Sequence, residues 1–201
     1  MEHIHRFHDW ICIFVFSISL LRFSLIIIIW KESNTYRYLN ESQTLETMWT
    51  FLPSVMLAAV VLPSLRLLYL VDEGGTLGVS IKAVGHQWYW QYDYPDAQYD
   101  SYLKRWEVYR LLQSDHRLFT NNGYRTQLIV TAADVLHSWT VPTLGVKADA
   151  VPGRVNKLFL RPKRAGVYHG QCSEICGRNH SFMPICLECC FDLIYYTECN
   201  K

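Results

Sequence analysis

The sequence predicts a membrane-anchored all-β protein, in which a hairpin of two transmembrane helices precedes a Greek-key β-sandwich or barrel. Two long apolar stretches near the N-terminus predict the helices, and short strand-like segments separated by turn residues predict the sandwich. The chain has 201 residues, 50% of them hydrophobic, and a formal net charge of +1. So small a net charge argues against nucleic acid as a partner.

The first apolar stretch runs from about residue 10 to residue 30, and about 20 such residues cross a bilayer core of about 30 Å. A cleavable signal peptide has only about 7 to 15 apolar residues before a small-residue cleavage site, whereas Lys31 and Glu32 follow here. Arg22 lies near mid-span, where a charge costs about 2.5 to 3.5 kcal/mol. We therefore expect Arg22 to face protein or to reach the membrane surface.

The second apolar stretch covers about residues 49–70 and contains Pro53 and Pro63, which membrane helices tolerate when neighbouring groups satisfy the freed carbonyls. Residues 1–71 are thus expected to form an N-terminal tail and two membrane helices. Two spans place both chain ends on one side of the membrane. Residues 72–201 are expected to form a soluble domain large enough for its own core.

Residues 72–201 show the patterns of β-strands. Apolar and polar residues alternate over 77–83 and 88–94, as in half-buried strands. Shorter apolar segments at 128–131, 158–160 and 185–194 are separated by Pro, Gly and Asn. No stretch within residues 72–201 has the pattern of a long amphipathic helix. A Greek-key sandwich follows, because it allows loops that are distant in the sequence to meet at one end.

A run of soft metal donors, Cys172, Cys176, His180 and Met183, lies near the C-terminus. Thiolate, imidazole and thioether together favour copper, and His137 is the expected second imidazole. A mononuclear site needs one thiolate, so two thiolates predict a bridged copper pair of the kind that carries electrons. The spacing alone leaves open a zinc site with two Cys and two His, or a disulfide between the two cysteines.

The remaining cysteines fit no motif. Seven cysteines are an odd number, which argues against a disulfide framework. We interpret most of the five outside the donor run as small buried apolar residues. The five are Cys12, Cys186, Cys189, Cys190 and Cys199. A Cys189–Cys190 pair that binds a separate metal stays open, although nothing nearby in the sequence supplies convincing partner ligands.

Four segments resemble subunit II of the haem-copper cytochrome c oxidases: residues 85–90, 134–139, 152–154 and 170–184. The resemblance covers about residues 44–188 and implies a cupredoxin-like sandwich with a binuclear copper centre, CuA. It implies electron transfer from cytochrome c to haem a in subunit I, where oxygen is reduced to water and protons are pumped. The implied copper ligands are His137, Cys172, the main-chain carbonyl of Glu174, Cys176, His180 and Met183.

The same resemblance implies three further roles. The Glu174 carboxylate would bind a magnesium ion shared with subunit I, and Trp88 would receive electrons from cytochrome c. Glu46, which we place in the hairpin loop just before the second apolar stretch, would stand at the entrance of a proton path. Each residue also has a simpler interpretation. Glu174 could be an exposed loop acid, Trp88 part of a buried aromatic stripe, and Glu46 a carboxylate stabilised by a helix dipole.

Acidic residues surround the Trp88 segment. Asp93, Asp96 and Asp100 occur where residues 83–103 contain no Lys or Arg, and Asp134 lies near His137. We expect them to form a docking surface for a basic cytochrome c, with an effect mainly on the rate of encounter. The simpler interpretation is a solvated surface.

By the resemblance, we expect the mitochondrial inner membrane with the copper domain in the intermembrane space, rather than a bacterial plasma membrane with a periplasmic domain. Two other functions stay open. One is a copper-free membrane scaffold of the quinol-oxidase kind, against which the intact cysteines argue. The other is a tethered copper-delivery module, which would release its metal to a weak chelator.

Overall fold

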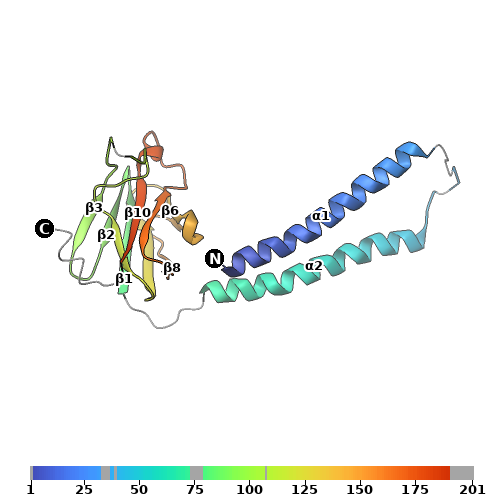
Figure 1. Ribbon diagram of the computed structural model, residues 1–201, viewed down its shortest axis with the longest axis horizontal. Coiled ribbons are helices and arrows are strands. Elements are labelled where there is room, and N and C mark those ends of the chain that lie inside the picture. The colour runs from blue at the N-terminus through green and yellow to red at the C-terminus, as the bar shows by residue number, and fades with distance from the viewer. Residues whose placement is uncertain (1, 33–36, 39, 73–78, 107, 191–201) are drawn as a thin grey trace. The chain divides into compact units, whose positions relative to one another are not determined.

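The computed structural model describes residues 2–32, 37–38, 40–72, 79–106 and 108–190 (Figure 1). The chain forms two compact units, Met1–Glu73 and Gly74–Lys201. Three predictions fall on residues outside those described: the first positions of the strand at 77–83, the end of the apolar segment at 185–194, and Cys199.

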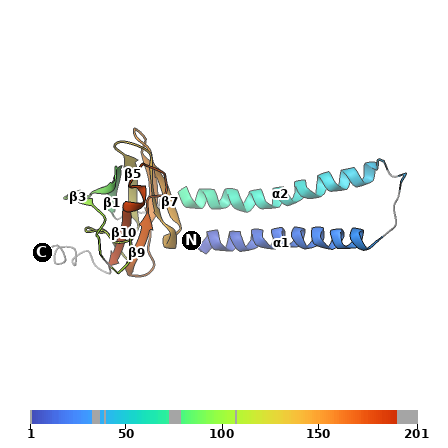
Figure 2. The ribbon, with the colours of Figure 1, turned by 90° about the horizontal axis from the view of Figure 1, so that it is seen from above.

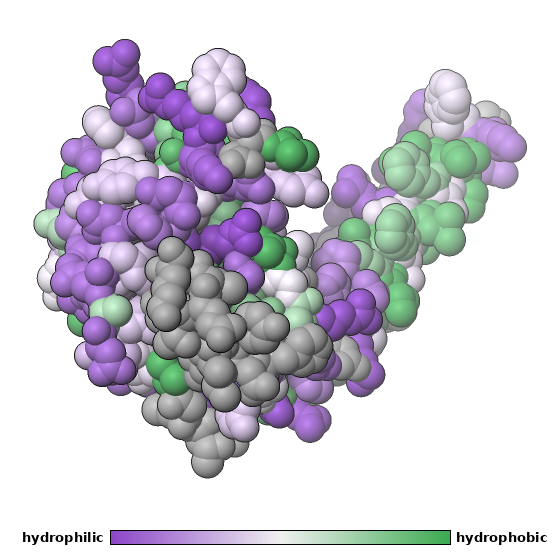
Figure 3. Space-filling model, turned by 60° about the vertical axis from the view of Figure 1, so that its left-hand side comes forward, coloured by the Kyte–Doolittle hydropathy of each residue, from purple (hydrophilic) through white to green (hydrophobic). Residues whose placement is uncertain are grey.

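The first unit is a hairpin of two helices, α1 (Glu2–Lys31) and α2 (Gln43–Asp72), which run side by side (Figures 1 and 2). Both are long and apolar enough to cross a membrane. Their large apolar side chains are exposed, and Figure 3 shows hydrophobic residues along them. Hydroxyl groups donate to carbonyls one turn earlier, as from Ser17 to Ile13 at 2.7 Å, which satisfies them without water.

Both helices extend beyond the predicted apolar stretches. α1 begins at Glu2, so the expected N-terminal tail is helical, and α2 begins at Gln43. Glu46 therefore lies in the first turn of α2 rather than in the preceding loop, because no Gly or Pro stops the helix there. Pro53 and Pro63 lie inside α2, and Arg22 is exposed on α1.

The described residues of the second unit form ten short strands. The larger sheet has the order β3 (Gln98–Ser101), β2 (Tyr89–Asp93), β1 (Val79–His86), β5 (Thr126–Ala132), β8 (Asn156–Leu160). The smaller sheet has the order β4 (Leu118–Asn121), β10 (Pro184–Cys190), β9 (Gly166–Gln171), and a further pair joins β6 (His137–Val141) to β7 (Val146–Ala150). Its described residues contain only two short 3₁₀ helices, η1 (Pro142–Leu144) and η2 (His180–Phe182).

Three of the seven strand pairings among the described residues join segments that are distant in the sequence: β1 with β5, β4 with β10, and β5 with β8. β1 pairs with β5 in parallel, and β10 pairs in parallel with β4. Such parallel pairs need crossover connections, so the strand order departs from that of simple hairpins. The loops that follow β1, β5 and β9 therefore meet at the same end of the domain, as expected for a sandwich whose functional residues come from distant loops.

The core of the β unit is rich in aromatic side chains. Along β2, Trp90 and Tyr92 are fully buried, whereas the alternate positions are half-buried, which confirms the predicted period of two. Trp139 of β6 is also fully buried, and its Nε1 donates to the Tyr92 hydroxyl at 3.2 Å. Each such aromatic removes about 150–250 Å² from water, worth about 4–6 kcal/mol before the cost of ordering the chain.

One close backbone contact positions the functional end of the domain. A Cβ on Gly170 of β9 would lie only 1.8 Å from the carbonyl oxygen of Thr140 in β6, so only glycine fits. Beyond that contact, Ser173 N donates to the carbonyl oxygen of Ser138 at 3.0 Å. The start of β6, with His137, therefore lies next to the segment that follows β9, with Cys172.

Candidate metal centre

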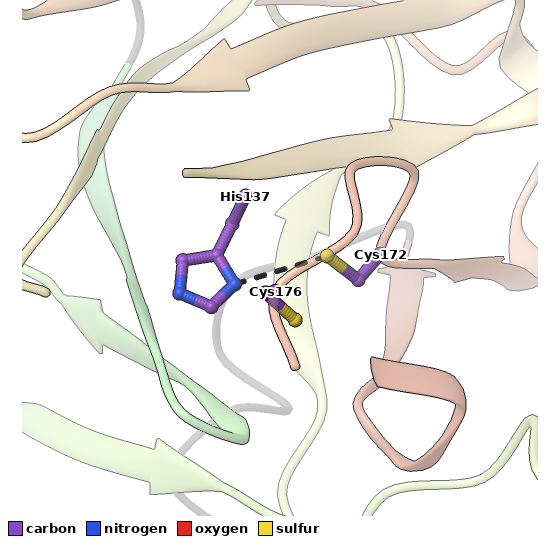
Figure 4. Close-up of side chains that lie close together, drawn as sticks. All are labelled: His137, Cys172 and Cys176. Carbon is purple, nitrogen blue, oxygen red and sulfur yellow. Dashed lines mark hydrogen bonds between the residues drawn. The ribbon is translucent and has the colours of Figure 1, made fainter. Parts of the chain in front are cut away.

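The structure brings His137, Cys172 and Cys176 together although 35 residues separate the histidine from the first cysteine. His137 Nδ1 faces Cys172 Sγ at 3.9 Å, and Cys176 lies alongside (Figure 4). The donor atoms of these three residues all lie within 4.8 Å of one another. His137 is fully buried, and the two cysteines are only 6% and 4% exposed. The site is therefore a closed cluster of soft donors.

The other three predicted ligands complete two similar groups of donors. Cys176 Sγ lies 3.4 Å from His180 Nδ1 and 3.4 Å from Met183 Sδ. Cys172 Sγ has His137 on one side and the carbonyl oxygen of Glu174 at 3.4 Å on the other. Each sulfur thus has one imidazole and one weaker donor beside it. This arrangement suits two metal ions bridged by two thiolates better than one ion.

Two glycines make room for the cluster. The His137 ring packs on Gly85 of β1, where a Cβ would come within 2.8 Å of the ring carbon Cδ2. Gly177 follows Cys176 and has a φ of 122°, a backbone conformation that residues other than glycine rarely adopt. Both lie in segments that resemble the family, but their packing role depends on tertiary contacts that the sequence does not show.

Hydrogen bonds around the cluster orient its donors. Asp134 accepts from His137 Nε2 at 2.9 Å and from the backbone N–H groups of Gln87 and Val135 at 2.6 Å each. Because His137 Nε2 is engaged, Nδ1 is left to face the sulfurs. The Gln87 side chain donates to the carbonyl oxygen of Cys176 at 2.7 Å. Sequence reasoning gave Gln87 no role and assigned Asp134 only to docking.

The two thiols differ in acidity. Burial by itself raises the pKa of Cys172, but hydrogen bonds with His137 and with the backbone outweigh burial and lower it. Burial and the neighbouring Cys172 raise the pKa of Cys176 to about 12. Burial lowers the pKa of His137, whereas its hydrogen bonds to Cys172 and Asp134 raise it overall. A bound cation would hold both sulfurs as thiolates, since metal binding displaces thiol protons.

The donor set fits copper better than the alternatives that the spacing left open. A zinc site would need only the two cysteines and two histidines. Met183, 1% exposed, and the Glu174 carbonyl add two weak donors that zinc does not require, whereas copper sites use such ligands. Cys172 and Cys176 are both free thiols, so the structure shows no disulfide between them.

Trp88 lies beside this cluster. It occupies the turn between β1 and β2 and is half-buried, and a Cβ on Gly177 would come 3.2 Å from its ring carbon Cζ2. The Trp88 ring thus lies against Gly177, the residue that directly follows Cys176. The rest of the predicted aromatic stripe is internal, since Trp90 and Tyr92 are fully buried and the Tyr94 hydroxyl donates to Phe119 O at 2.8 Å.

The predicted acidic residues do not gather around Trp88. Asp93 lies at the far end of β2, about 17 Å away for an extended strand of five residues, and it pairs with Lys82 at 3.4 Å. Asp96 lies in the turn that follows β2. Asp100 lies on β3, where it is the cross-strand partner of Gln91 in β2. Asp134 alone lies at the donor cluster. Glu174 has an exposed side chain, and Glu46 belongs to the helical unit.

The cysteines outside the donor cluster vary in burial. Cys186 and Cys189 are 1% and 2% exposed, as expected for small apolar residues. Cys190 in β10 and Cys12 in α1 are half-buried, so two of the four described cysteines outside the donor run are buried as predicted for most of them. Cys190 lies at the end of its strand, where its side chain is not fully covered.

Comparison with known proteins decides the family. The sequence matches the family models "Cytochrome C oxidase subunit II, transmembrane domain" over residues 1–67 and "Cytochrome C oxidase subunit II, periplasmic domain" over residues 79–190. It is 47% identical over 197 residues to cytochrome c oxidase subunit 2 of Branchiostoma floridae, across 94% of this chain and 85% of that protein. The chain belongs to the cytochrome c oxidase subunit II family. The Branchiostoma lanceolatum subunit 2 is also 47% identical, across 94% of this chain and 82% of that protein.

Solved subunit II domains share the fold of the β unit. The periplasmic domain of subunit II (CoxB) of Bradyrhizobium japonicum is 37% identical, with a TM-score of 0.60 over 63% of this chain and 94% of that chain. A subunit II domain in a mixed disulfide with the thioredoxin-like TlpAs is 36% identical, with a TM-score of 0.55 over 64% and 92% of the two chains. These matches confirm the predicted oxidase component with two transmembrane helices and a cupredoxin-like domain.

Proposed function

We propose that this subunit holds two copper ions at the donor cluster and passes single electrons from cytochrome c to haem a in subunit I. The observation that carries the proposal is that each of two buried thiols has its own imidazole and its own weak donor. A copper pair held by Cys172 and Cys176 would supply a one-electron relay, because one unpaired electron would be shared between both metals. The family places such a CuA centre in this domain.

The protein's contribution is a rigid and dry frame. The donor loop is anchored at both ends by the paired strands β9 and β10, and Cys172 N donates to the Met183 carbonyl at 3.3 Å across its base. His137 is held between Gly85 and Asp134. Donors that are largely buried and hydrogen-bonded in this way resist displacement, so little reorganisation would accompany each electron transfer.

Trp88 is the proposed point at which electrons arrive from cytochrome c. Its support is position, since the half-buried ring packs against Gly177 next to Cys176. Gln87, the preceding residue, contacts the Cys176 carbonyl through its side chain and Asp134 through its backbone. The Trp88 turn and the donor loop therefore form one hydrogen-bonded assembly.

Asp93, Asp96, Asp100 and Asp134 remain the proposed acidic docking residues for a basic cytochrome c. Their support is their charge alone, because they are spread over the β2–β3 hairpin and the donor end. At physiological ionic strength exposed charges act over about 8 Å. Such residues would speed encounter rather than hold the bound partner.

Two further residues have proposed roles toward partner subunits. The exposed Glu174 carboxylate is the proposed magnesium ligand at the boundary with subunit I, and its support is that its own carbonyl oxygen faces Cys172. Because Mn²⁺ also accepts oxygen ligands, Mn²⁺ loading of the assembled oxidase should give a spin-resonance signal that Glu174→Ala removes. An unchanged signal would contradict this role.

Glu46 in the first turn of α2 is the proposed entrance of a proton path. Glu46→Gln in the assembled oxidase should slow turnover with no change in the copper signal, whereas unchanged turnover would leave only a helix-dipole role.

We also propose that the protein lies in the mitochondrial inner membrane, with the copper domain in the intermembrane space. Its support is the 47% identity to two animal proteins, and membrane fractionation with protease protection of the β domain tests it.

Metal analysis combined with spin resonance tests the copper proposal. The full chain, purified from its membrane with the assembled oxidase, should show a mixed-valence signal with hyperfine splitting from two equivalent copper nuclei. Splitting from a single nucleus, or zinc in the site, would overturn the proposal. A copper-delivery module would instead lose its metal to a weak chelator, and a copper-free scaffold would give no signal.

A further inference from the structure

A second cysteine–histidine cluster lies on the outer part of the β9–β10 pair, apart from the proposed copper pair. Cys186 of β10 is the cross-strand partner of His169 in β9, whereas Pro184 and Gln171 are partners at the end of the two strands near the donor loop. Two residues separate these positions along each strand, which corresponds to about 7 Å. Cross-strand partners project from the same face of a sheet, so the thiol and the imidazole lie next to each other.

Three potential ligand atoms converge at this point. Cys186 Sγ lies 3.5 Å from His169 Nδ1, and both atoms lie 2.9 Å from the carbonyl oxygen of Leu112. A point equidistant from the three atoms is about 1.8 Å from each of them. An ion slightly out of their plane would therefore meet nitrogen and sulfur at about 2.0–2.3 Å, the lengths found for zinc.

The segment before β4 closes this cluster from outside. Leu111 has a φ of 62°, an uncommon conformation for leucine, and directly precedes the carbonyl that faces the pair. Ser114 N donates to Cys186 Sγ at 3.3 Å, and the Tyr109 ring lies 5.5 Å from the His169 ring. Cys186 is 1% exposed as a result, while His169 is half-buried. The sulfur is enclosed, and the imidazole still reaches the surface.

The cluster repeats the donor types of the proposed copper pair. There, too, a buried thiol has an imidazole Nδ1 at 3.4–3.9 Å and a main-chain carbonyl oxygen at 3.4 Å. Not every buried cysteine of this chain has such neighbours. Among the described residues, no histidine lies within hydrogen-bond distance of Cys189, which is buried on the same strand.

We infer that Cys186, His169 and the carbonyl of Leu112 form a separate binding site for one Cu(I) ion. On binding, the Cys186 thiol proton leaves to solvent and the His169 proton moves from Nδ1 to Nε2, so that one S–Cu and one N–Cu bond form without any change of oxidation state. The thiolate then neutralises the single charge of the ion, which suits a buried position. A divalent ion would keep a net charge there, and zinc also requires a fourth ligand.

This inference does not depend on the proposed electron-transfer function, and a double variant separates the two. The full chain in detergent micelles, with Cys172→Ser and Cys176→Ser, has no bridging thiolates. Titrated without oxygen against a chromophoric Cu(I) chelator, it should retain one equivalent of Cu(I). X-ray absorption should show one sulfur and one or two nitrogen or oxygen neighbours.

Further substitutions in that background identify the ligands. Cys186→Ser should remove the retained copper, and the matched control Cys189→Ser should keep it. Outer residues of metal sites change affinity by about 10- to 100-fold, so His169→Phe, which removes a direct ligand, should weaken binding by about tenfold or more. His169→Phe leaves the thiol in place and keeps a ring beside Tyr109, and an unchanged thermal unfolding midpoint shows that the fold is kept.

The inference is wrong if the double variant retains no Cu(I), or if neither Cys186→Ser nor His169→Phe lowers the copper retained. The three groups would then form only a hydrogen-bonded contact. Either result leaves the mixed-valence spin-resonance test of the unaltered chain unaffected, so failure of one proposal is distinguishable from failure of the other.

Discussion

The donor run at 172–183 and the acidic residues at 93–100 were both predicted to be functional, but only the donor run converges in space. The other four predicted copper donors lie beside the sulfurs of Cys172 and Cys176, whereas Asp93 lies a strand's length from Trp88 and pairs with Lys82. Metal ligands must share an ion within bond distance, so strand ends have to bring them together. Long-range charges act across several ångströms of solvent and need no such convergence.

The largest expected effect tests the converged region directly. Cys176→Ser should abolish both the mixed-valence signal and oxidase turnover with cytochrome c, because the pair loses one bridging thiolate. Spin resonance and oxygen consumption of the assembled oxidase measure this. Cys189→Ser, a buried cysteine outside the cluster, is the matched control and should leave both unchanged. Turnover in Cys176→Ser at the unaltered rate would show that electrons bypass the cluster.

Asp134 belongs to both regions and sharpens the contrast between them. If its main role is to orient His137, Asp134→Ala should lower copper affinity by about 10- to 100-fold, measured by competition with a chelator. Asp134→Asn keeps one acceptor oxygen and should restore part of the affinity. A variant that keeps full affinity and only loses salt-dependent association with cytochrome c would return Asp134 to the docking surface.

Trp88 tests whether electrons arrive at the donor end. An aromatic hot spot at an interface is worth about 2 kcal/mol, so Trp88→Ala should lower the second-order rate with cytochrome c by about 30-fold. The copper signal should stay intact, which separates a partner contact from a structural role. Trp106→Ala is the matched control, since Trp106 is fully exposed on another loop and should not affect the rate. Equal rates in both variants would place the contact elsewhere.

The smallest effect is expected in the dispersed acidic region. Asp93→Asn, Asp96→Asn and Asp100→Asn together should slow association with a basic cytochrome c by about three- to tenfold at low ionic strength and little at high salt. Stopped-flow rates at several salt concentrations measure this. Lys82→Gln removes the cation beside Asp93 and should act in the opposite direction. A salt-independent loss would contradict an electrostatic role.

The sequence predicts best those features that depend on the local pattern of residue types. Two apolar stretches of membrane length and the alternation along β2 follow from local pattern, and both appear in the structure. Both helices begin several residues before the apolar stretches, because the polar residues that precede each stretch are compatible with both loop and helix. Glu46 therefore changed from a loop residue to a helix residue.

The sequence by itself determined which donors are present, since cysteine, histidine and methionine at short spacing already select a soft metal. Only the tertiary structure decided how they are used. The approach of β9 to β6 at Gly170 set His137 beside Cys172, and the register of β10 on β9 set Cys186 beside His169. These neighbours come from different strands, and their proximity depends on packing and strand register, which no local pattern of residues encodes.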